Sequence, residues 1–203
     1  MEDNMSKELW KPGNMVYPVP PALVSTGAKD GRTNIFTVAW TGNVCTDPPM
    51  VYISVRPERY SYGFIEETGE FVINLTTEEL VRAADLCGVR SGRDLDKWKE
   101  CGLTPEKASE LEFAPLIAES PVNIECRVKQ HLDLGSHRMY IAEVIKVHAD
   151  SRYIDEKGRF CLEEAGLIAY VHGDYVRTGE KLGSFGYSVR KQKAGKKPGQ
   201  RRK

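Results

Sequence analysis

The sequence lacks any long hydrophobic run. No window approaches the roughly eighteen apolar residues that are typical of a membrane-spanning helix, and the polar segment Met1–Lys11 has no apolar centre of the kind found in secretory signals. The hydrophobic fraction is 40% and the charged fraction is 29%, as in globular proteins. At 203 residues the chain is long enough to bury a sizeable core. We therefore expect a globular protein of the cytoplasm, without membrane contact.

Closely spaced cysteine pairs are also missing. The five cysteines are an odd number, spread from Cys45 to Cys161, and no two of them form a C-x-x-C pair. This spacing argues against a zinc site and against a disulfide framework. We expect reduced thiols that serve mostly as small core residues.

The common catalytic and nucleotide-binding motifs are absent. There is no G-x-G-x-x-G after a strand, no G-x-x-x-x-G-K-[ST], no H-E-x-x-H and no G-x-S-x-G. The four histidines lack the spacing of metal ligands. A nucleotide-like ligand would therefore have to bind outside the Rossmann and P-loop schemes.

The end of the chain has no acidic residue. Residues 190–203 carry eight Lys or Arg, which leaves 21 basic against 29 acidic residues elsewhere, although the formal net charge of the whole chain is zero. A segment rich in Gly, Pro and Lys cannot bury apolar surface. We predict a single folded domain over residues 1–189 and a disordered, solubilising tail over residues 190–203. The alternative for the tail is an arm that binds nucleic acid or another polyanion, and of the two we favour the solubilising tail without a nucleic-acid partner.

Alternating residues in the first half predict short antiparallel strands. The segments Pro21–Ala28 and Thr33–Trp40 flank Asp30-Gly31, which is a typical hairpin turn. Two further strands are expected over Met50–Val55 and Glu70–Leu75. The first half is therefore predicted to be mainly β.

Helix signals appear between and after these strands. Tyr60–Thr68 can form two helical turns that end at Gly69 in the left-handed conformation. Thr76-Thr-Glu-Glu79 matches a capping box, Asp94 can cap a short helix, and Thr104-Pro105 is a further helix start signal. The middle of the chain is therefore predicted to be a helical insertion.

A second long hairpin is predicted near the end of the domain. Alternation over Val122–His131 and over Arg138–His148 indicates two strands joined by a turn at Gly135-Ser136. Two antiparallel ribbons and several short strands favour an antiparallel β-barrel, since closure removes exposed edges. The predicted fold class is a mainly β protein, a β-barrel with helical insertions.

The segment Arg56-Pro-Glu-Arg-Tyr-Ser-Tyr62 joins a predicted strand to a predicted helix. A helix start presents free backbone N–H groups, and an Arg with hydroxyls beside it completes a pocket for one phosphate group. The segment therefore indicates a ligand that carries a phosphate. The alternative is an ordinary strand-to-helix connection with a solvated Arg.

Five motifs in order resemble the FMN-binding split barrels of the flavin-reductase-like family, which includes flavoredoxins and ferric reductases. The resemblance runs from about Pro18 to Ser188 and is carried by Asn34-Ile-Phe-Thr-Val-Ala-Trp40, Asp47-Pro-Pro49, Arg56-Pro-Glu-Arg-Tyr-Ser61, Ser91-Gly-Arg-Asp-Leu-Asp-Lys97 and His137-Arg-Met-Tyr-Ile-Ala-Glu-Val144. It implies an antiparallel split β-barrel of the FMN-binding type. It also implies a homodimer that holds FMN near the subunit interface.

The resemblance assigns roles to nine residues. It places Asn34, Trp40 and Thr41 against the isoalloxazine ring, and Arg59 and Ser61, with Tyr62, at the phosphate. It places the remaining three at the flavin or the nicotinamide side: Lys97, His137 and Tyr170.

Other readings of three of these residues stay open. A Trp at a strand end, such as Trp40, also commonly packs in a hydrophobic core or in a subunit interface. Lys97 beside Asp94 and Asp96 is also typical of a surface ion pair. His137 follows a turn, so it is either an exposed histidine or a candidate proton donor, the only candidate catalytic residue of the chain.

The implied function is oxidoreduction through bound FMN. NADH or NADPH would deliver hydride to the flavin, and electrons would pass to free flavin, ferric iron or a partner protein. The alternatives are a non-catalytic FMN carrier reduced by another protein, and a polyanion-binding protein that uses the basic tail. No metal is expected.

Overall fold

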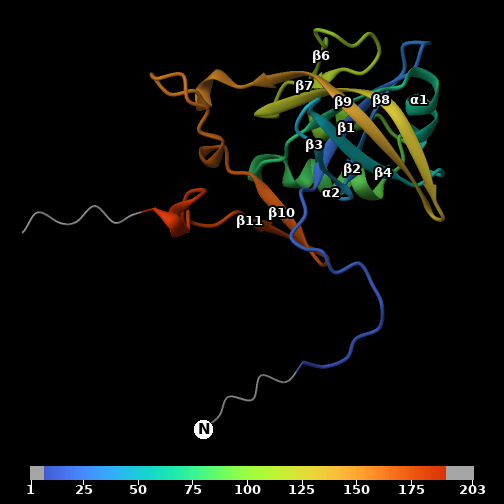
Figure 1. The fold of residues 1–203 in the computed structure, drawn as a ribbon. Coiled ribbons are helices and arrows are strands. Elements are labelled where there is room, and N and C mark those ends of the chain that lie inside the picture. The colour runs from blue at the N-terminus through green and yellow to red at the C-terminus, as the bar shows by residue number, and fades with distance from the viewer. Residues whose placement is uncertain (1–6, 191–203) are drawn as a thin grey trace, which may run out of the picture.

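The computed structural model describes residues 7–190, and seven of its strands form one antiparallel sheet (Figure 1). In sheet order β2-β1-β5-β8-β9-β4-β3, the strands are Thr33–Val38, Ala22–Gly27, Glu70–Asn74, Val122–Leu134, His137–Ala149, Met50–Val55 and Thr41–Cys45. From residue 191 on, the predicted basic tail lies outside the described residues.

The sheet closes on itself at Trp40. Strands β2 and β3 stand at opposite ends of the sheet order, yet they follow each other in the chain and are joined by Ala39 and Trp40. The backbone carbonyl of Trp40 accepts a hydrogen bond of 2.9 Å from the amide of Ser54 in β4. Apolar side chains of β1, β2, β4, β5, β8 and β9 fill the interior. The fold is therefore the predicted mainly β split barrel.

Both predicted hairpins are confirmed. Strands β1 and β2 pair over six residues around the Asp30-Gly31 turn, where Gly31 has a φ of 87°. Strands β8 and β9 are the long ribbon around Gly135-Ser136. The expected strands β4 and β5 are present as well, whereas β3 was not predicted.

The first helix also agrees with its prediction. Helix α1 spans Tyr60–Thr68, and Gly69 ends it in the left-handed conformation with a φ of 68°. Phe64 and Ile65 are buried, and the helix packs on β1, β2 and β5. Its first residue therefore has a fixed position beside the barrel.

The capping box predicted at Thr76-Thr-Glu-Glu79 is wrong. The hydroxyl of Thr76 donates to the carbonyl of Pro21 at 2.7 Å, and Thr77 makes no side-chain cap hydrogen bond. The helical turn η1 (Glu78–Leu80) leads into α2 (Val81–Val89) without a cap. The carbonyl of Pro21, which directly precedes β1, thus takes the hydroxyl that the capping box would use.

Two further helix signals were also misplaced. Helix α3 (Lys97–Cys101) is capped by Asp96, whose side chain accepts from the amides of Trp98 and Lys99, and not by Asp94. Thr104-Pro105 does not start a helix, because β6 (Pro105–Glu106) pairs with β7 (Leu116–Ile117). The insertion is therefore part helix and part irregular loop.

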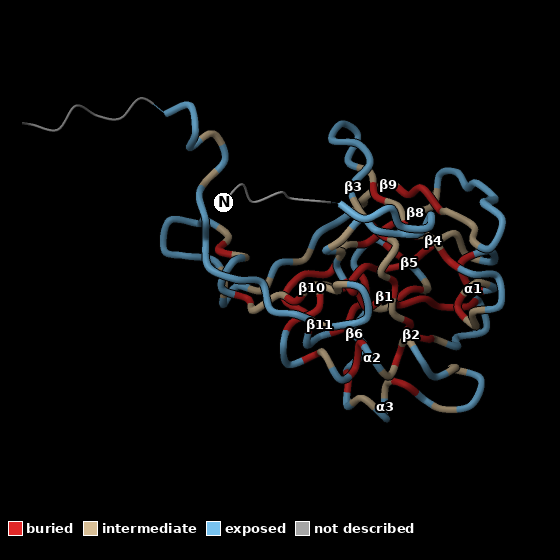
Figure 2. Tube along the Cα trace, turned by 90° about the horizontal axis from the view of Figure 1, so that it is seen from below, coloured by how far each residue is buried: buried red, intermediate tan, exposed pale blue. Residues whose placement is uncertain are grey.

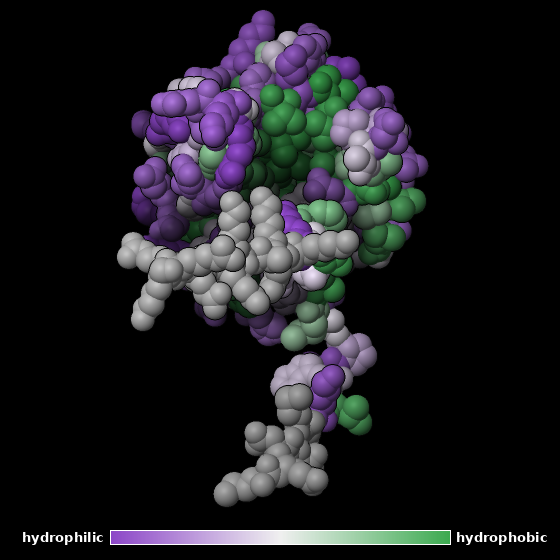
Figure 3. Space-filling model, turned by 60° about the vertical axis from the view of Figure 1, so that its left-hand side comes forward, coloured by the Kyte–Doolittle hydropathy of each residue, from purple (hydrophilic) through white to green (hydrophobic). Residues whose placement is uncertain are grey.

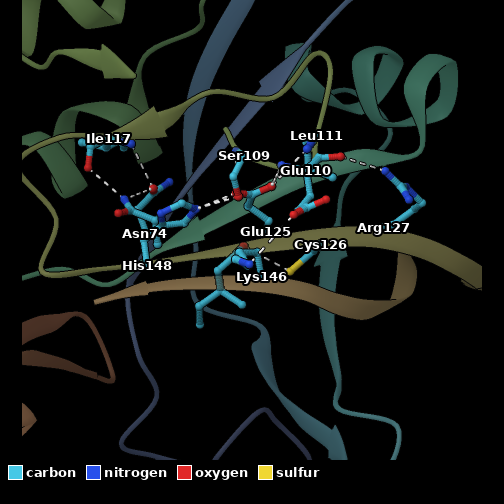
Figure 4. Close-up of polar contacts among 12 residues, drawn as sticks. Asn74, Ser109, Glu110, Leu111, Ile117, Glu125, Cys126, Arg127, Lys146 and His148 are labelled. Carbon is cyan, nitrogen blue, oxygen red and sulfur yellow. Dashed lines mark hydrogen bonds and ion pairs between the residues drawn. The ribbon is translucent and has the colours of Figure 1, made fainter. Parts of the chain in front are cut away.

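Two buried carboxylates hold five consecutive backbone amides of this loop. Glu125 accepts hydrogen bonds from the amides of residues 109–111, and Glu70 accepts from the amides of residues 112 and 113. Glu125 also accepts from the Ser109 hydroxyl and lies 2.6 Å from Nε2 of His148 (Figure 4). Burial alone would raise the pKa of Glu125, but the hydrogen bonds from His148, Ser109 and Glu110 outweigh it and lower this pKa to about 2. The loop is therefore fixed to the barrel by charge-assisted hydrogen bonds.

The end of the chain forms a small ribbon and an extended segment. Strands β10 (Ile168–Val171) and β11 (Asp174–Arg177) pair with each other, and Val19 bridges to Tyr170. Short helical turns are found at η2 (Ser151–Tyr153), η3 (Leu162–Glu164) and η4 (Tyr187–Val189). Burial is concentrated in the barrel, and the segments before Tyr17 and after Arg177 are mostly exposed (Figure 2). Among residues 7–190, no helix has the length and apolar character needed to cross a bilayer.

Candidate functional site

A cavity of about 810 Å³ opens beside the seam of the barrel. Its walls come from β2, β4, the start of β9 and the N-terminal segment, and the lining residues are Gly13, Asn14, Met15, Val16, Val19, Phe36, Thr37, Val38, Ala39, Trp40, Tyr52, Ser54, Val55, Arg56, Arg59, Leu134, Ser136, His137 and Met139. This volume lies in the range of about 300–1,000 Å³ that is typical of small-molecule sites. We call it the main cavity.

A second cavity of about 270 Å³ adjoins the main one. It is lined by Asn34, Phe36, Arg56, Glu58, Arg59, Tyr60, Val89, Arg90, Ser91, Gly92, Arg93 and Lys97. Phe36, Arg56 and Arg59 line both cavities. The two cavities therefore form one continuous site, and we call the smaller one the cation cavity.

The cation cavity carries an excess of positive charge. Its lining has five cationic side chains and a single carboxylate, that of Glu58. The ion pair of this carboxylate with Arg56 is long, at 3.7 Å, and exposed. Arg93 donates to the backbone carbonyl of Glu58 at 3.1 Å and lies over the ring of Tyr60. Because one carboxylate cannot balance five cations, the arrangement suits a multiply charged anion.

Arg59 stands where the two cavities meet. It is the N-terminal cap residue of α1, in extended conformation, and the first turn of this helix has no acidic residue. Its guanidinium donates to the carbonyl of Gly88 at 2.7 Å, which holds the side chain against the end of α2. The geometry thus agrees with the phosphate pocket expected at this strand-to-helix junction.

Lys97 is buried in the wall of the cation cavity. Its ammonium donates to the carbonyls of Ile35 at 2.8 Å and Cys87 at 2.9 Å, and the residue is only 3% exposed. Burial lowers the pKa of Lys97. The reading of Lys97 as a surface ion pair with Asp94 or Asp96 is therefore wrong, because its partners are backbone carbonyls.

Asn34 and Ser61 lie side by side, but only Asn34 reaches a cavity. The Asn34 amide donates to Oγ of Ser61 at 2.8 Å, and the Thr26 hydroxyl donates to the same oxygen at 3.0 Å. Ser61 is fully buried and does not line either cavity, whereas Asn34 lines the cation cavity. A Cβ atom on Gly92 would come within 2.1 Å of Oδ1 of Asn34, so the loop can approach Asn34 this closely only with glycine there.

Trp40 and His137 are brought together in the main cavity, while Thr41 is not. Thr41 is buried, and its hydroxyl donates to the carbonyl of Tyr52 at 2.7 Å. His137 lies at the start of β9 with its Nδ1 2.9 Å from the Ser136 hydroxyl. Partial burial, together with the positive charges of Arg56 and Arg59, lowers the pKa of His137. A lowered pKa favours the uncharged imidazole, which can hydrogen-bond to a ligand without acting as its counter-ion.

Two predicted site residues lie outside both cavities. Tyr62 packs against the barrel core beneath the guanidinium of Arg138, whose central carbon is 5.6 Å from the ring centroid. Tyr170 lies on β10, and its ring centroid is 6.2 Å from that of Tyr17, which in turn lies 6.3 Å from the Trp40 ring. Tyr170 is therefore a neighbour of the main cavity without lining it, because its backbone pairs with Val19, which does line the cavity.

Several lining residues were not predicted from the sequence. Arg56, Ser91, Gly92 and Arg93 belong to motifs that were recognised, but their side chains had no assigned role. Arg90 and the N-terminal residues 13–16 carried no local signal. Only the fold brings these segments together.

The arrangement can hold a molecule with a large planar or apolar part and a compact anionic end. The main cavity offers the flat side chains of Trp40 and Phe36, and the cation cavity offers guanidinium groups suited to a phosphate. FMN has both parts, so the residues present fit this cofactor. Within residues 7–190, no cluster of three or more His, Cys, Asp or Glu side chains could bind a metal ion.

Comparison with known proteins gives a family match over most of the chain. Residues 14–186 match the family model described as the flavin reductase like domain. Among curated proteins, the reductase component of 4-nitrophenol 4-monooxygenase/4-nitrocatechol 2-monooxygenase from Rhodococcus opacus is 26% identical over 126 residues, which are 62% of this chain and 64% of that protein.

Solved structures share the fold. Flavoredoxin of Desulfovibrio vulgaris (Miyazaki F) superposes with a TM-score of 0.84 at 29% identity, covering 91% of this chain and 100% of that one. An FMN-binding protein from Thermus thermophilus superposes with a TM-score of 0.73 at 22% identity, covering 91% of this chain and 99% of that one, and at this identity it shows the fold alone.

Proposed function

Because the chain belongs to the flavin reductase like family, we propose that it binds FMN across the two joined cavities and acts as an NAD(P)H-dependent oxidoreductase. The observation that carries this proposal is the shared lining of the cavities. Arg56, Arg59 and Phe36 connect a cluster of cations to a larger, partly apolar cavity, which is the arrangement that a phosphate ester of a planar ring system needs.

In this proposal the cation cavity anchors the phosphate. Arg59 is held by the Gly88 carbonyl and Lys97 by those of Ile35 and Cys87, so both cations are oriented before a ligand arrives. Fixed cations lose little conformational entropy on binding, which strengthens the anchor. Arg56 and Arg93 are more exposed and add positive charge at the entrance.

The main cavity orients the rest of the cofactor. FMN bound there would supply the redox chemistry, the transfer of electrons from a reduced nicotinamide to a second molecule. Trp40 offers a flat face, and the neutral imidazole of His137 donates or accepts a hydrogen bond without adding charge. No side-chain nucleophile is needed for this chemistry.

The cofactor and the reductant can be tested in one experiment. The protein is purified, freed of ligand, titrated with FMN and then mixed under anaerobic conditions with NADH or NADPH while the visible absorption is recorded. We expect saturable FMN binding and rapid bleaching with at least one of the two nucleotides. A protein that ignores FMN in the titration would refute the proposal.

The likeness to a flavoredoxin favours a second candidate function, that of an FMN carrier reduced by another protein. In the same experiment such a carrier would bind FMN but would not be bleached by NADH or NADPH. Addition of a separate flavin-reducing enzyme with its nucleotide would then bleach it. The acceptor is in either case a small molecule or a partner protein.

We also propose that the working form is a homodimer. Seven large apolar residues on the two extended segments are more than 60% exposed, namely Leu9, Trp10, Val16, Leu182, Phe185, Tyr187 and Val189. On one face, hydrophobic side chains gather in a hollow rimmed by hydrophilic ones (Figure 3). Exposed apolar surface of this kind marks interaction sites. Light scattering coupled to size-exclusion chromatography should give twice the mass of the chain, and a monomer would refute this part of the proposal.

A further inference from the structure

Two thiols lie next to each other behind the cation cavity. Cys87 is near the end of α2 and Cys101 ends α3, and their Sγ atoms are 3.8 Å apart. Both are free thiols. Cys45, Cys126 and Cys161 instead place their sulfur atoms near backbone carbonyls. Within residues 7–190, this is the only thiol pair at such a distance.

The two thiols differ in exposure. Cys87 is fully buried, whereas Cys101 is partly exposed. A small oxidant can therefore reach Cys101 from solvent, and Cys87 lies within contact distance to react next. Solvent-accessible cysteines that undergo reversible oxidation often lie next to a second, resolving cysteine.

The pair is connected to the cations of the second cavity through the backbone of α2. The carbonyl of Cys87 accepts the hydrogen bond from Lys97, and the carbonyl of the next residue, Gly88, accepts the hydrogen bond from Arg59. Lys97 itself begins the helix that Cys101 ends. A movement of Cys101 therefore acts on Lys97 in the same helix, and a movement of Cys87 acts on the carbonyls that position Lys97 and Arg59.

We propose that Cys87 and Cys101 form a site of reversible oxidation that closes to a disulfide, and that closure changes the anion affinity of the cation cavity. Hydrogen peroxide is the oxidant, and its two-electron reduction to water balances the oxidation of two thiols to one disulfide. The thiolate of Cys101 attacks a peroxide oxygen, the O–O bond breaks, and Cys101 becomes a sulfenic acid as water leaves. The sulfur of Cys87 then attacks the Cys101 sulfur, the S–O bond breaks, and a second water leaves as the disulfide forms.

Closure requires a real change of geometry. A disulfide has an S–S length of about 2.05 Å, so sulfur atoms now 3.8 Å apart must approach by more than about 1.5 Å. Helices α2 and α3 pack directly against each other, so part of this approach is transmitted to their backbones. Lys97 and the Gly88 carbonyl lie within this region and shift with it.

The surroundings set the rate of this reaction. Burial raises the pKa of Cys87 to about 12 and also raises the pKa of Cys101. The positive charges of Arg82 and Lys97 oppose the rise at Cys101, and the negative charge of Glu100 adds to it. The thiolate is the reactive form. Oxidation is therefore slow at neutral pH and becomes faster as the pH rises.

The first test maps the disulfide in the full-length protein. After treatment of the folded protein with hydrogen peroxide and blocking of free thiols, trypsin releases one cysteine on peptide 83–90 and the other on peptide 100–107. We expect the two peptides joined, with the loss of two hydrogen atoms, and separated again by dithiothreitol. Cys45→Ser, which removes an exposed thiol, should keep the joined product, and Cys101→Ser should abolish it. Absence of the joined peptides from folded protein would overturn the proposal.

The second test measures the effect on the cavity and rests on the proposed function. FMN and, separately, inorganic phosphate are titrated against the reduced and the oxidised protein. We expect oxidation to weaken both ligands by at least about threefold, the effect of one weakened hydrogen bond to a charged group. Equal affinities in the two states would overturn the link to the cavity. A protein that forms the disulfide but binds neither ligand would refute the proposed function and leave the oxidation site standing.

Discussion

Glu125→Gln should destabilise the protein by about 3 kcal/mol at neutral pH. The carboxylate accepts three consecutive loop amides and a hydrogen bond from His148 while fully buried. Its pKa falls from 4.5 to about 2 in the folded protein. Since one pKa unit corresponds to about 1.36 kcal/mol, the charged form contributes on the order of 3 kcal/mol. Glutamine keeps the shape and places an amide donor where an acceptor is needed.

Urea denaturation of both proteins as a function of pH measures this contribution. The folded pKa is lower than the unfolded one, so the stabilisation is fully present above about pH 4.5 and is lost as the pH falls toward 2. The free-energy difference between the proteins should therefore be constant near neutral pH and shrink in that acidic window. At neutral pH the melting temperature should drop by about 6–12 °C for a chain of this size.

The matched control is Glu110→Gln on the same loop. The side chain of Glu110 is half exposed, and its ion pair with Lys146 is 3.9 Å long, so this change should stay within about 0.5 kcal/mol. A Glu125→Gln protein as stable as the parent at neutral pH, or a difference that does not depend on pH, would refute the reasoning.

Three further predictions concern the cavities. In a fluorescence titration, Arg59→Ala should weaken FMN binding by about 1.5–3 kcal/mol, the value of a charge-assisted hydrogen bond. The control is Arg152→Ala on the exposed η2 turn, and an equal loss of affinity in both variants would contradict a role for Arg59. Gly92→Ala places a Cβ against Asn34, and this overpacking should cost about 1–3 kcal/mol of folding stability in urea denaturation and weaken FMN binding in the titration, with the circular dichroism spectrum unchanged. Parent-like stability and full affinity would mean that the loop does not form the binding wall. Burial lowers the pKa of Lys97, so its ammonium should lose its proton at a lower pH than an ordinary lysine does. The affinity for FMN should therefore fall as the pH rises through this lowered pKa. FMN titrations at several pH values should show this fall in the parent protein and not in Lys97→Met.

The hairpins and the first helix could be predicted because their signals are local. Asp30-Gly31 fixes a tight turn through backbone conformation alone, and Gly69 ends α1 for the same reason. The position of Arg59 at the start of α1 was predicted from the local strand-to-helix pattern, while its role at a phosphate stays a prediction. Such features need no knowledge of distant partners.

The remaining features depend on contacts between distant parts of the chain. Thr76 gave a false cap signal because Pro21, which is far away in sequence, accepts its hydroxyl. Ser61 looked like a phosphate contact but is buried against Thr26 and Asn34. The cation cavity joins three separate segments, and Arg90 becomes part of it only when the end of α2 meets the start of α1.

One backbone hydrogen bond at Trp40 connects the main cavity to the pairing of the barrel strands. The backbone carbonyl of this residue accepts a hydrogen bond from the Ser54 amide, which extends the pairing of β3 with β4 to the point where the chain arrives from β2, and Trp40 and Ser54 both line the main cavity. A molecule bound in the main cavity would contact both residues of this hydrogen bond. The Ser54 amide should consequently exchange its hydrogen with solvent more slowly once the cavity is filled, so that a single backbone proton reports occupancy without any colour change.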